Sequence, residues 1–461
     1  MHLSLLLTLF ASADWGQFRG PNASGVSADT NLPAALRPDR SVIWKTALPE
    51  GYSSPSVAGD RIFVTAVDHE KLLTIALDRV SGKILWRREA PRPRKQEMQR
   101  ANSPASATPA TDGVRVYSFF QDFGLIAYGP DGNELWRMAM GPFNNPFGHG
   151  SSPVLAMGGG TLIMNIDQDT DSYLLALDAK SGKTLWRTRR DHAQRGYATP
   201  VVYGNQVIVA GSYRMSGYDL ATGGEIWWIG GLPWQIKPTP IVQDGVVYFL
   251  TFSGESDPGE QEKVPVFTEA LKLYDANKDG RISKDELPDP KAKARFEEYL
   301  DLDHTGFLEE RDWERFRDRR AGENALRAYK IEGAKGDITE FGFLWKNSKT
   351  LPNVPSPLLY QGVLYTLKEG GIFSSFDPKT GQVLKQGRLQ GALGTYYSSP
   401  VAADGKIYLA NEDGKTVVLK AGAQWEIVSV GEFDAGIKAT PAITGGKIFL
   451  RTHNAVYCFG K

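Results

Sequence analysis

Cysteine is almost absent from this chain, because only Cys458 of its 461 residues is one. The chain therefore cannot form an internal disulfide, and it has no cluster of thiolates that could bind a metal. An excess of charge is absent too, since 53 basic residues balance 53 acidic ones, and neither nucleic acid nor an acidic substrate is indicated. No run approaches the roughly 18 apolar residues of a membrane span, so no transmembrane segment is predicted.

The first 13 residues have the pattern of a signal peptide. An apolar run from Leu3 to Phe10 is followed by Ala-Ser-Ala, small residues that suit signal peptidase. Residues 1–13 are therefore predicted to be cleaved off, and the protein is expected to be secreted or periplasmic. A buried first strand is the alternative, because the segment is short and has no Lys or Arg before the apolar run.

Internal repetition is the dominant pattern in the rest of the chain. A Ser/Thr-Pro step, an apolar run, a Gly-containing turn and a second apolar run recur eight times, starting near residues 53, 107, 151, 198, 238, 355, 398 and 439. Two further runs follow around turns such as SGK, DGN or TGQ. Four antiparallel strands that end in tryptophan are typical of a propeller blade. The sequence predicts an all-β fold, an eight-bladed β-propeller.

The last of these units is one strand short. It ends at AVYCFGK after its third run, whereas SVIWKTAL at residues 41–48 is a strand pattern without a unit of its own. The two are predicted to complete each other, with Ile43 and Trp44 in the outer strand of the blade that begins at Pro441. Such a closure removes the exposed edge that a linear array of sheets would leave.

Several of these motifs resemble a known family. ALDRVSGKILW and ALDAKSGKTLW resemble the tryptophan docking repeats of pyrroloquinoline-quinone-like eight-bladed propellers. DWGQFRGP at residues 14–21 resembles the opening of many secreted members. The resemblance covers nearly all of the chain outside residues 255–322. The family includes quinone-dependent alcohol dehydrogenases, barrel-assembly lipoproteins and other secreted propellers, so the resemblance implies the fold more strongly than the function.

The dehydrogenase branch implies features that this sequence lacks. Its members have two adjacent cysteines beside the quinone and hold a channel calcium with Glu, Asn and Asp, whereas Cys458 stands alone and no match to that calcium set is found. Pyrroloquinoline quinone is therefore not expected as a cofactor. A quinone-dependent oxidoreductase acting on an alcohol or a sugar is kept as the alternative function. The lipidated cysteine typical of the barrel-assembly branch is missing as well.

An insertion interrupts the fifth unit. Pro240 and Pro357 occupy equivalent positions in consecutive units, yet many more residues separate them than separate Pro357 from Pro400. The propeller is predicted to comprise residues 14–254 and 323–461, with residues 255–322 inserted between the second and third strands of the fifth blade. Because that connection lies on the same face as the links between blades, the insertion is expected beside the mouth of the central channel.

DANKDGRISKDE, residues 275–286, has the spacing of an EF-hand calcium loop. Calcium prefers six to eight oxygen ligands, and this spacing wraps a short segment around one ion. Gly280 occupies the position of the sharp turn. A solvated acidic loop is the alternative. The predicted ligands are Asp275, Asn277, Asp279, the carbonyl of Arg281, Ser283 through water, and Glu286.

A second loop of the same kind, DLDHTGFLEERD, spans residues 301–312. EF-hands normally occur in pairs, and apolar residues before the first loop and after the second indicate flanking helices. The last position is Asp312 where Glu is usual, and its side chain is one methylene shorter. Both a second calcium site and an empty structural partner loop remain open. The predicted ligands are Asp301, Asp303, Thr305, the carbonyl of Phe307, Glu309 and Asp312.

Aromatic and basic residues precede the Ser/Thr-Pro steps, where the innermost strands begin. They are expected to line a funnel at the channel mouth for an anionic ligand, a sugar or a partner protein, because aromatic and cationic groups that converge in a concavity form a binding site. An ordinary solvated rim is the alternative. The predicted funnel residues are Tyr52, Arg100, His149, Tyr197, Lys237, Tyr397 and Lys438.

Together these patterns predict a secreted or periplasmic calcium-binding β-propeller. It is expected to act as a monomeric, non-catalytic scaffold for a ligand or a protein. No Ser, Cys or Thr lies in a recognisable nucleophile motif, and the six His are scattered along the chain.

Overall fold

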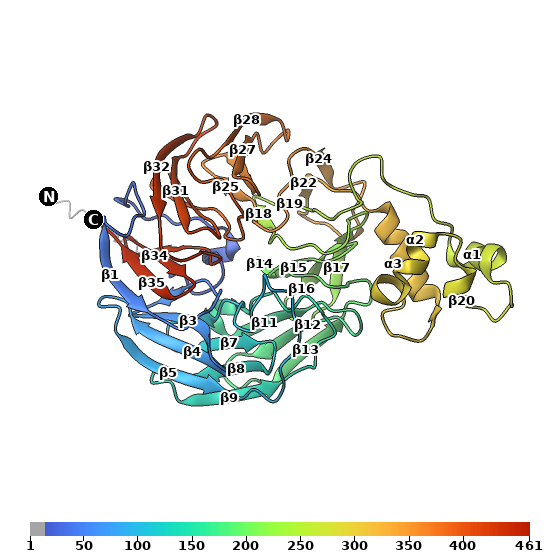
Figure 1. The fold of residues 1–461 in the computed structure, drawn as a ribbon, viewed down its shortest axis with the longest axis horizontal. Helices are drawn as coiled ribbons and strands as arrows, with labels where there is room; N and C mark the ends of the chain where they lie inside the picture. The colour runs from blue at the N-terminus through green and yellow to red at the C-terminus, as the bar shows by residue number, and fades with distance from the viewer. Residues whose placement is uncertain (1–13) are drawn as a thin grey trace, which may run out of the picture.

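The computed structural model describes residues 14–461, so the predicted signal peptide lies outside the described residues. Eight sheets are arranged around a central axis (Figure 1), which confirms the eight-bladed β-propeller. Seven of the sheets have four strands and one has a fifth. Within residues 14–461 no helix is long and apolar enough to cross a membrane.

Blades 1 to 4 follow one another along the chain. In each blade the strand that follows the Ser/Thr-Pro step is the innermost, and the sheet runs outward from it in sequence order. The strands are β2 (Ser56–Ala58), β3 (Arg61–Asp68), β4 (Lys71–Asp78) and β5 (Ile84–Ala90); β6 (Ala110–Thr111), β7 (Val116–Phe120), β8 (Gly124–Tyr128) and β9 (Glu134–Ala139); β10 (Val154–Ala156), β11 (Thr161–Ile166), β12 (Tyr173–Asp178) and β13 (Thr184–Arg189); and β14 (Val201–Tyr203), β15 (Gln206–Ala210), β16 (Met215–Asp219) and β17 (Glu225–Ile229).

Blades 5 to 8 complete the ring, and the chain's first strand belongs to the last blade. A short strand from blade 5, β23 (Gly336–Asp337), pairs in parallel with the outer strand of blade 4. The other strands are β18 (Ile241–Gln243), β19 (Val246–Leu250), β22 (Leu326–Lys330) and β24 (Phe343–Asn347); β25 (Leu358–Tyr360), β26 (Val363–Lys368), β27 (Ile372–Phe376) and β28 (Val383–Arg388); β29 (Val401–Ala403), β30 (Lys406–Ala410), β31 (Lys415–Lys420) and β32 (Glu426–Glu432); and β33 (Ala442–Thr444), β34 (Lys447–Thr452), β35 (Ala455–Phe459) and β1 (Val42–Ala47).

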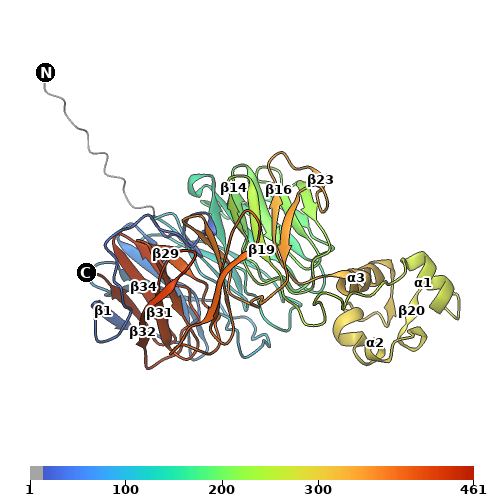
Figure 2. The same ribbon diagram turned by 90° about the horizontal axis from the view of Figure 1, so that it is seen from above.

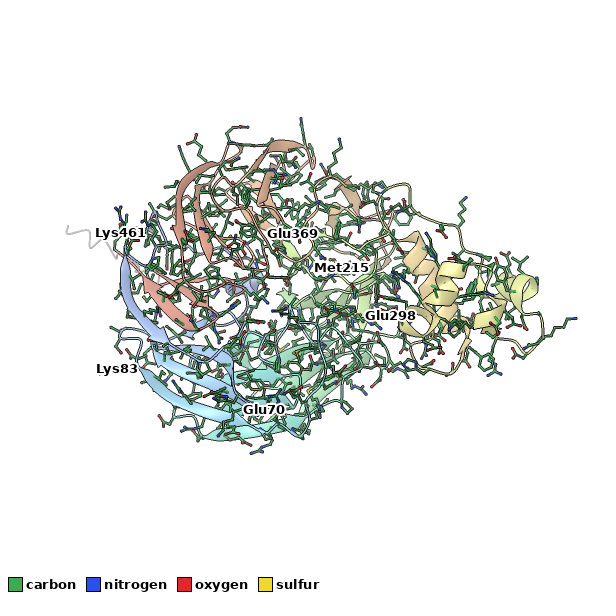
Figure 3. The ribbon with its side chains drawn as sticks, viewed as in Figure 1. Glu70, Lys83, Met215, Glu298, Glu369 and Lys461 are labelled. Carbon is green, nitrogen blue, oxygen red and sulfur yellow. The ribbon has the colours of Figure 1, made fainter. Side chains whose placement is uncertain are left out.

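The helical insertion leaves the ring between β19 and β22, which pair with each other, as the sequence predicts. It projects from the side of the ring (Figure 2), and Glu298 lies on its side nearest the blades (Figure 3). A core of its own, including Phe296 and Trp313, holds it together. Its elements are α1 (Phe267–Tyr274), β20 (Ile282–Ser283), η3 (Lys284–Glu286), α2 (Pro290–Ala294), η4 (Phe296–Leu300), β21 (Phe307–Leu308) and α3 (Glu310–Ala321).

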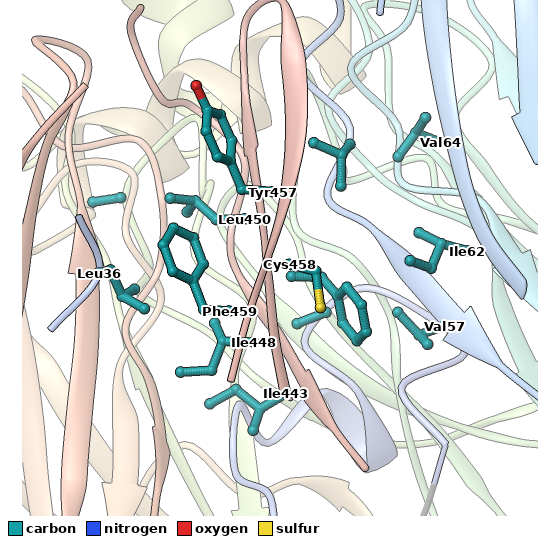
Figure 4. Packing of buried hydrophobic residues seen from close by; sticks show 14 of the residues in the cluster. Leu36, Val57, Ile62, Val64, Ile443, Ile448, Leu450, Tyr457, Cys458 and Phe459 are labelled. Carbon is teal, nitrogen blue, oxygen red and sulfur yellow. The ribbon is translucent and has the colours of Figure 1, made fainter. Parts of the chain in front are cut away.

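The two ends of the propeller chain close the ring, as predicted. Strand β1 pairs antiparallel with β35, and Trp44 lies opposite Cys458. Apolar side chains from blade 8 and blade 1, among them Ile448 and Val57, pack into one core (Figure 4). Because hydrophobic burial and main-chain pairing act at the same seam, the outward edge of β35 is not left unpaired.

At five of the eight junctions between blades, a tryptophan joins one blade to the next in the same way. The ring of Trp44 lies so close to Gly82 that a Cβ on that glycine would be 2.5 Å from it, and Gly82 has a φ of +70°. Glycine is required there for both reasons. Each indole N–H also donates to a carbonyl of the following blade, at 2.8–3.3 Å. The five pairs are Trp44–Gly82, Trp86–Gly132, Trp136–Gly182, Trp186–Gly223 and Trp345–Gly381.

Blade 4 departs from this docking pattern. The indole of Trp227 donates to Gln206 of its own blade at 2.8 Å, and the ring covers Gly217 of the same blade. Parallel pairing with β23 occupies the outer edge instead, with Trp227 opposite Gly336. The outer strand of blade 4 therefore pairs with a main-chain segment of blade 5, whereas at five other junctions a tryptophan packs on a turn glycine.

A closed ring of hydrogen bonds runs around the central axis. The Ser or Thr that precedes each proline donates its backbone N–H to the hydroxyl of the equivalent residue in the next blade, at 2.9–3.3 Å, and Thr440 donates back to Ser54. A Ser or Thr is needed at each step because only a short hydroxyl side chain can accept this bond there. The members in order are Ser54, Thr108, Ser152, Thr199, Thr239, Ser356, Ser399 and Thr440.

The segment that follows residue 13 crosses one face of the ring. Trp15 bridges to Val57 of blade 1, and Gln17 accepts a hydrogen bond from Leu155 of blade 3 at 3.0 Å. The fully buried Arg19 donates to the carbonyl of Pro357 in blade 6 at 2.7 Å. These contacts reach the innermost strands of blades on opposite sides, so the segment forms a floor across the centre of the ring.

Replacing Trp44 by alanine tests the closing seam. Trp44 is half-buried, so we expect Trp44→Ala to lower the free energy of unfolding by about 2–3 kcal/mol, below the ~3–5 kcal/mol of a fully buried ring. Urea denaturation measures the change. Ile43→Ala is the control, because Ile43 is 46% exposed on the same strand and should cost less than about 0.5 kcal/mol. Equal losses for both variants would contradict the docking role.

Candidate functional site

The first predicted calcium loop begins where α1 ends, at Tyr274. Asp275 accepts hydrogen bonds from the backbone N–H groups of Asp279 and Gly280, at 3.2 and 2.9 Å, and Asn277 accepts one from Asp279 at 2.9 Å. Gly280 has a φ of +80°, the left-handed conformation that the sharp turn requires. The loop therefore curls around its own side-chain oxygens.

Glu286 ties the two ends of this loop together. Its Oε1 accepts from the N–H groups of Ala276 and Asn277 at 3.0 and 3.4 Å, and its Oε2 accepts from the N–H and hydroxyl of Ser283, both at 2.8 Å. The hydrogen bonds from Ser283 hold the pKa of Glu286 below its usual range. A carboxylate that is ionised and drawn back to the start of the loop is what an EF-hand ligand set requires.

The second loop lies back to back with the first. Strands β20 and β21 pair antiparallel, with Ile282 opposite Leu308. Asp301 accepts hydrogen bonds from the N–H groups of Thr305 and Gly306 at 2.9 and 2.8 Å, as Asp275 does in the first loop. A short antiparallel pair of strands therefore joins the two loops.

Carboxylates alone do not make a metal site in either loop. In residues 14–461 no group of three or more His, Cys, Asp or Glu side chains is placed to hold a metal ion by itself. An ion in the first loop would therefore depend also on the amide of Asn277 and the carbonyl of Arg281, and one in the second on Thr305 and the carbonyl of Phe307. Oxygen ligands of these kinds suit calcium. Calcium binds oxygen atoms at about 2.3–2.6 Å in proteins and tolerates an irregular arrangement of them.

Arginines attach the insertion to blades 3 and 4. Arg315 of α3 donates to the carbonyl of Asp191 through Nε and Nη2, at 3.2 and 2.6 Å, and to the carbonyl of Asp169 at 3.4 Å. From the propeller side, Arg195 pairs with Asp169 and donates to the carbonyl of Glu298 at 3.1 Å. Both Arg195 and Asp169 are buried, so this contact excludes water.

Aromatic rings surround the same arginine. The guanidinium of Arg195 lies 5.3–5.7 Å from the ring centroids of Phe147, Trp234 and Tyr299. Arg319 of α3 lies over Trp234 and Tyr299 at 4.3 and 4.6 Å. These cation–π contacts join the ring to the insertion, and a groove of about 390 Å³ beside them is lined by residues of both, including Asn145 and His304.

A cavity of about 440 Å³ occupies the centre of the propeller. Its walls include the hydroxyl-bearing residues of four blades in the hydrogen-bonded ring, Thr199, Thr239, Ser356 and Ser399, and Phe18 of the segment that crosses the opposite face also borders it. Polar and aromatic side chains thus meet in one concavity, which is the usual composition of a ligand site. The other lining residues include Asn102, Phe147, Tyr197, Lys237, Asn353 and Tyr397.

Six of the seven predicted funnel residues lie in or beside this cavity. Tyr197, Lys237 and Tyr397, from three different blades, line it. The ammonium of Lys438 lies 4.2 Å from the ring centroid of Tyr52 and 5.3 Å from that of Tyr397. The exposed Arg100 lies between Gln99 and Ala101, which line the cavity.

The structure places His149 elsewhere. The residue is 2% exposed and does not line the cavity. Its ring stacks on Phe143 at 5.1 Å and lies 5.3 Å from Phe119, and these rings cover it. Burial lowers the pKa of His149 to about 4, so it stays neutral at physiological pH. His149 therefore packs against Phe119 and Phe143 and is not part of the predicted funnel.

Lys237 has the most perturbed charge in the cavity. Burial lowers its pKa to about 8, although Glu369 favours the charged form. Its ammonium donates to the carbonyl of Gln235 at 3.2 Å, and it forms no ion pair with any residue that the structure describes. Burial also raises the pKa of Tyr197, whose hydroxyl donates to Asn145 at 3.2 Å. The positive charge of Lys237 is therefore not balanced by an ion pair with any described residue.

Sequence reasoning missed several residues that build these sites. Phe18 is part of DWGQFRGP, which the sequence analysis used only as a family likeness, and nothing local indicates that it reaches the cavity. Arg195 and Arg315 carry no motif, although a basic residue in a helix that leads out of a calcium loop is a weak signal for docking. Their partners are backbone carbonyls far away in the chain, which no sequence pattern reveals.

Blades closed by docking tryptophans, around a channel with a Ser/Thr-Pro ring, define a pyrroloquinoline-quinone-like eight-bladed propeller. The sequence model of the family described as outer membrane protein assembly factor BamB matches residues 25–130 and 121–255. These segments cover half of the chain and end where the insertion begins, and the chain belongs to this family of propellers. No curated protein sequence matches the chain significantly.

Solved structures show the same fold. BamB from Moraxella catarrhalis superposes with a TM-score of 0.57 at 13% identity, over 91% of this chain and 99% of that one. A europium-containing methanol dehydrogenase gives 0.61 at 11% identity, over 97% and 98%. Quinohemoprotein alcohol dehydrogenase from Comamonas testosteroni gives 0.61 at 14% identity, over 97% and 81%. Identities this low establish a shared fold and leave the function open.

Removing the Arg315 side-chain donors tests how the insertion is held. We expect Arg315→Met to speed amide exchange in α3 and in residues 190–195 about tenfold or more, because hydrogen bonds from a charged donor to two carbonyls are lost. Hydrogen–deuterium exchange with mass analysis measures this change. Arg317→Met is the matched control, since Arg317 bonds to Val264 and Glu314 within the insertion. Equal exchange at residues 190–195 in both variants would refute the docking role.

Proposed function

We propose that this protein is a secreted or periplasmic calcium-binding propeller that holds an anionic ligand, or an acidic group of a partner protein, in its central cavity without catalysis. The observation that carries the proposal is Lys237, a half-buried cation with no ion-pair partner among the described residues, in a cavity of about 440 Å³. Desolvation makes such a charge costly, and an anionic ligand would offset that cost.

The other groups in the cavity fit a ligand of this kind. Tyr197 and Tyr397 offer flat apolar faces, and Asn102 and Asn353 offer amide groups that can fix an orientation. Lys438 lies close by and is balanced by Glu412 at 3.2 Å, so it adds less attraction than Lys237. A sugar would also find stacking faces here, but it would leave Lys237 without a counter-charge.

A quinone-dependent oxidoreductase is the second candidate, because the fold matches two quinone-family dehydrogenases over 97% of this chain. The residues fit a quinone poorly. Cys458 is buried in the core of blade 8, away from the cavity, and the chain has no second cysteine to pair with it. Incubation with pyrroloquinoline quinone and calcium is expected to give no dye reduction with alcohols or sugars. Substrate-dependent dye reduction would replace the scaffold proposal with this alternative.

Ligand binding should depend on the charge of Lys237. Because its pKa is about 8, the charged form dominates below that pH, and affinity for an anion should fall as the pH rises from 7 to 9. We expect Lys237→Met to weaken citrate binding about tenfold at pH 7 and to remove this pH dependence. Calorimetric titration with citrate, and with mannitol as a neutral comparison, measures both effects.

The exposed Lys83 on the outer side of blade 1 provides the control, and Lys83→Met should bind citrate like the parent. Mannitol binding more tightly than citrate would shift the proposal from an anion to a sugar. Citrate affinity that is unchanged by Lys237→Met would show that the cavity lysine does not recognise the ligand.

Calcium should organise the insertion and leave the ring unaffected, because the eight blades close without it. Glu286→Gln is expected to weaken calcium binding at least about tenfold, since one ionised ligand is lost. A site of about 10⁻⁴–10⁻³ M would be occupied outside the cytoplasm, so high affinity is not required. Melting of the propeller should stay within about 1 °C of the parent, on the grounds that distant sites act independently. Unfolding of the whole chain on chelation would contradict this division.

A further inference from the structure

The eleventh position of the two predicted calcium loops carries opposite charge, Asp285 in the first and Arg311 in the second. We propose that Arg311 neutralises the second loop from within, so that the protein takes up one calcium ion, at the first loop, and Arg311 excludes a second. The proposal rests on the proposed calcium function of the first loop. In this proposal the second loop is the structural partner of the first loop, and Arg311 supplies its positive charge.

Arg311 contacts two predicted calcium ligands at once. Its Nη2 lies 2.5 Å from Oδ2 of Asp303, and its Nε lies 3.6 Å from Oδ1 of Asp312. These carboxylates occupy the third and twelfth positions of the loop, two of the positions that supply ligands in an EF-hand. A guanidinium between them supplies a positive charge that calcium would otherwise bring.

The first loop has no such group. The position that corresponds to Arg311 is Asp285, which adds negative charge where the second loop adds positive charge. Arg281 pairs with Asp279 at 3.5 Å, but it lies at the seventh position, where only its carbonyl is expected to face an ion. Among the described residues, a cation therefore lies beside one predicted acidic ligand of the first loop, Asp279, whereas Arg311 lies beside two ligands of the second loop.

The twelfth position also behaves differently in the two loops. Glu286 accepts hydrogen bonds from Ala276 and Asn277 at the start of its loop. Asp312 accepts one only from Glu309 on its own helix, at 3.3 Å. Asp312 is only 2% exposed, and its buried Oδ1 accepts no hydrogen bond within the described part of the chain. That unmatched oxygen is directed toward Arg311, so the loop's remaining acceptor already has a cation beside it.

Arg315 keeps Asp312 in this position. It lies 3.9 Å from Oδ1 of Asp312 while its other N–H groups hold the carbonyls of Asp169 and Asp191 in the propeller. Moving Asp312 toward the start of its loop would pull it away from a side chain that is fixed to blades 3 and 4. The second loop is therefore held by the contact between the insertion and the propeller. The short side chain of Asp312 cannot stay beside Arg315 and also reach toward the start of its loop to bind an ion.

Calcium stoichiometry of the full chain tests the assignment. Calorimetric titration with calcium should give one ion in the parent, one in Arg311→Lys, which keeps a cation, and two in Arg311→Gln. Arg317→Gln, on the same helix but outside the loop, should stay at one. Adding Asp312→Glu to Arg311→Gln should tighten the new site severalfold, because the longer side chain reaches the ion with two oxygens.

The outcomes separate this inference from the function on which it rests. Two ions in the parent, or one ion in Arg311→Gln with an unchanged circular dichroism spectrum, would overturn the role of Arg311 and leave the calcium function standing. A single parental ion that persists in Glu286→Gln and is lost in Asp301→Asn would place calcium in the second loop and overturn the inference. No binding by the parent would overturn both.

Discussion

The rest of this structure depends on the closed ring of eight hydrogen bonds around its axis. Each bond links the Ser/Thr-Pro step of one blade to that of the next, and the last, from Thr440 to Ser54, joins the two ends of the propeller. A backbone donor and a short hydroxyl acceptor leave little freedom in the spacing of the blades. Farther from the axis, tryptophans that pack on glycines of the next blade also limit the spacing of the blades. The spacing is therefore fixed both near the axis and near the outer edge of the ring.

That closure creates the cavity. The innermost strands all begin beside the axis, so the residues just before each Ser/Thr-Pro step must converge, whatever blade they come from. Lys237 and Tyr397 belong to different blades yet line the same space. The segment with Phe18 and Arg19 crosses the opposite face, so the channel becomes a concavity with a floor. Burial without a counter-charge then lowers the pKa of Lys237, which links the geometry of the ring to its proposed ligand.

The insertion shows how a separate module is added to a closed ring. It uses a connection between two strands of blade 5, so no hydrogen bond around the axis is interrupted. Its own core holds it together, while Arg195 and Arg315 fasten it to neighbouring blades through backbone carbonyls. Because Arg315 also lies beside Asp312, the second loop is part of the attachment as well as of the loop pair. The first loop has no such tie and is the freer of the two.

The sequence by itself determined the number of blades, the closing strand with Trp44, the place of the insertion and the two loops, because each depends on a short pattern with a fixed spacing. Position before a Ser/Thr-Pro step, which is a local property, also pointed to Tyr197, Lys237 and Tyr397, which line the cavity. Only the tertiary structure decided that His149 is covered by Phe143, that Phe18 reaches the cavity and that Arg311 bridges Asp303 and Asp312. Burial and ion pairing depend on distances between segments remote in the chain, and no local pattern encodes those distances.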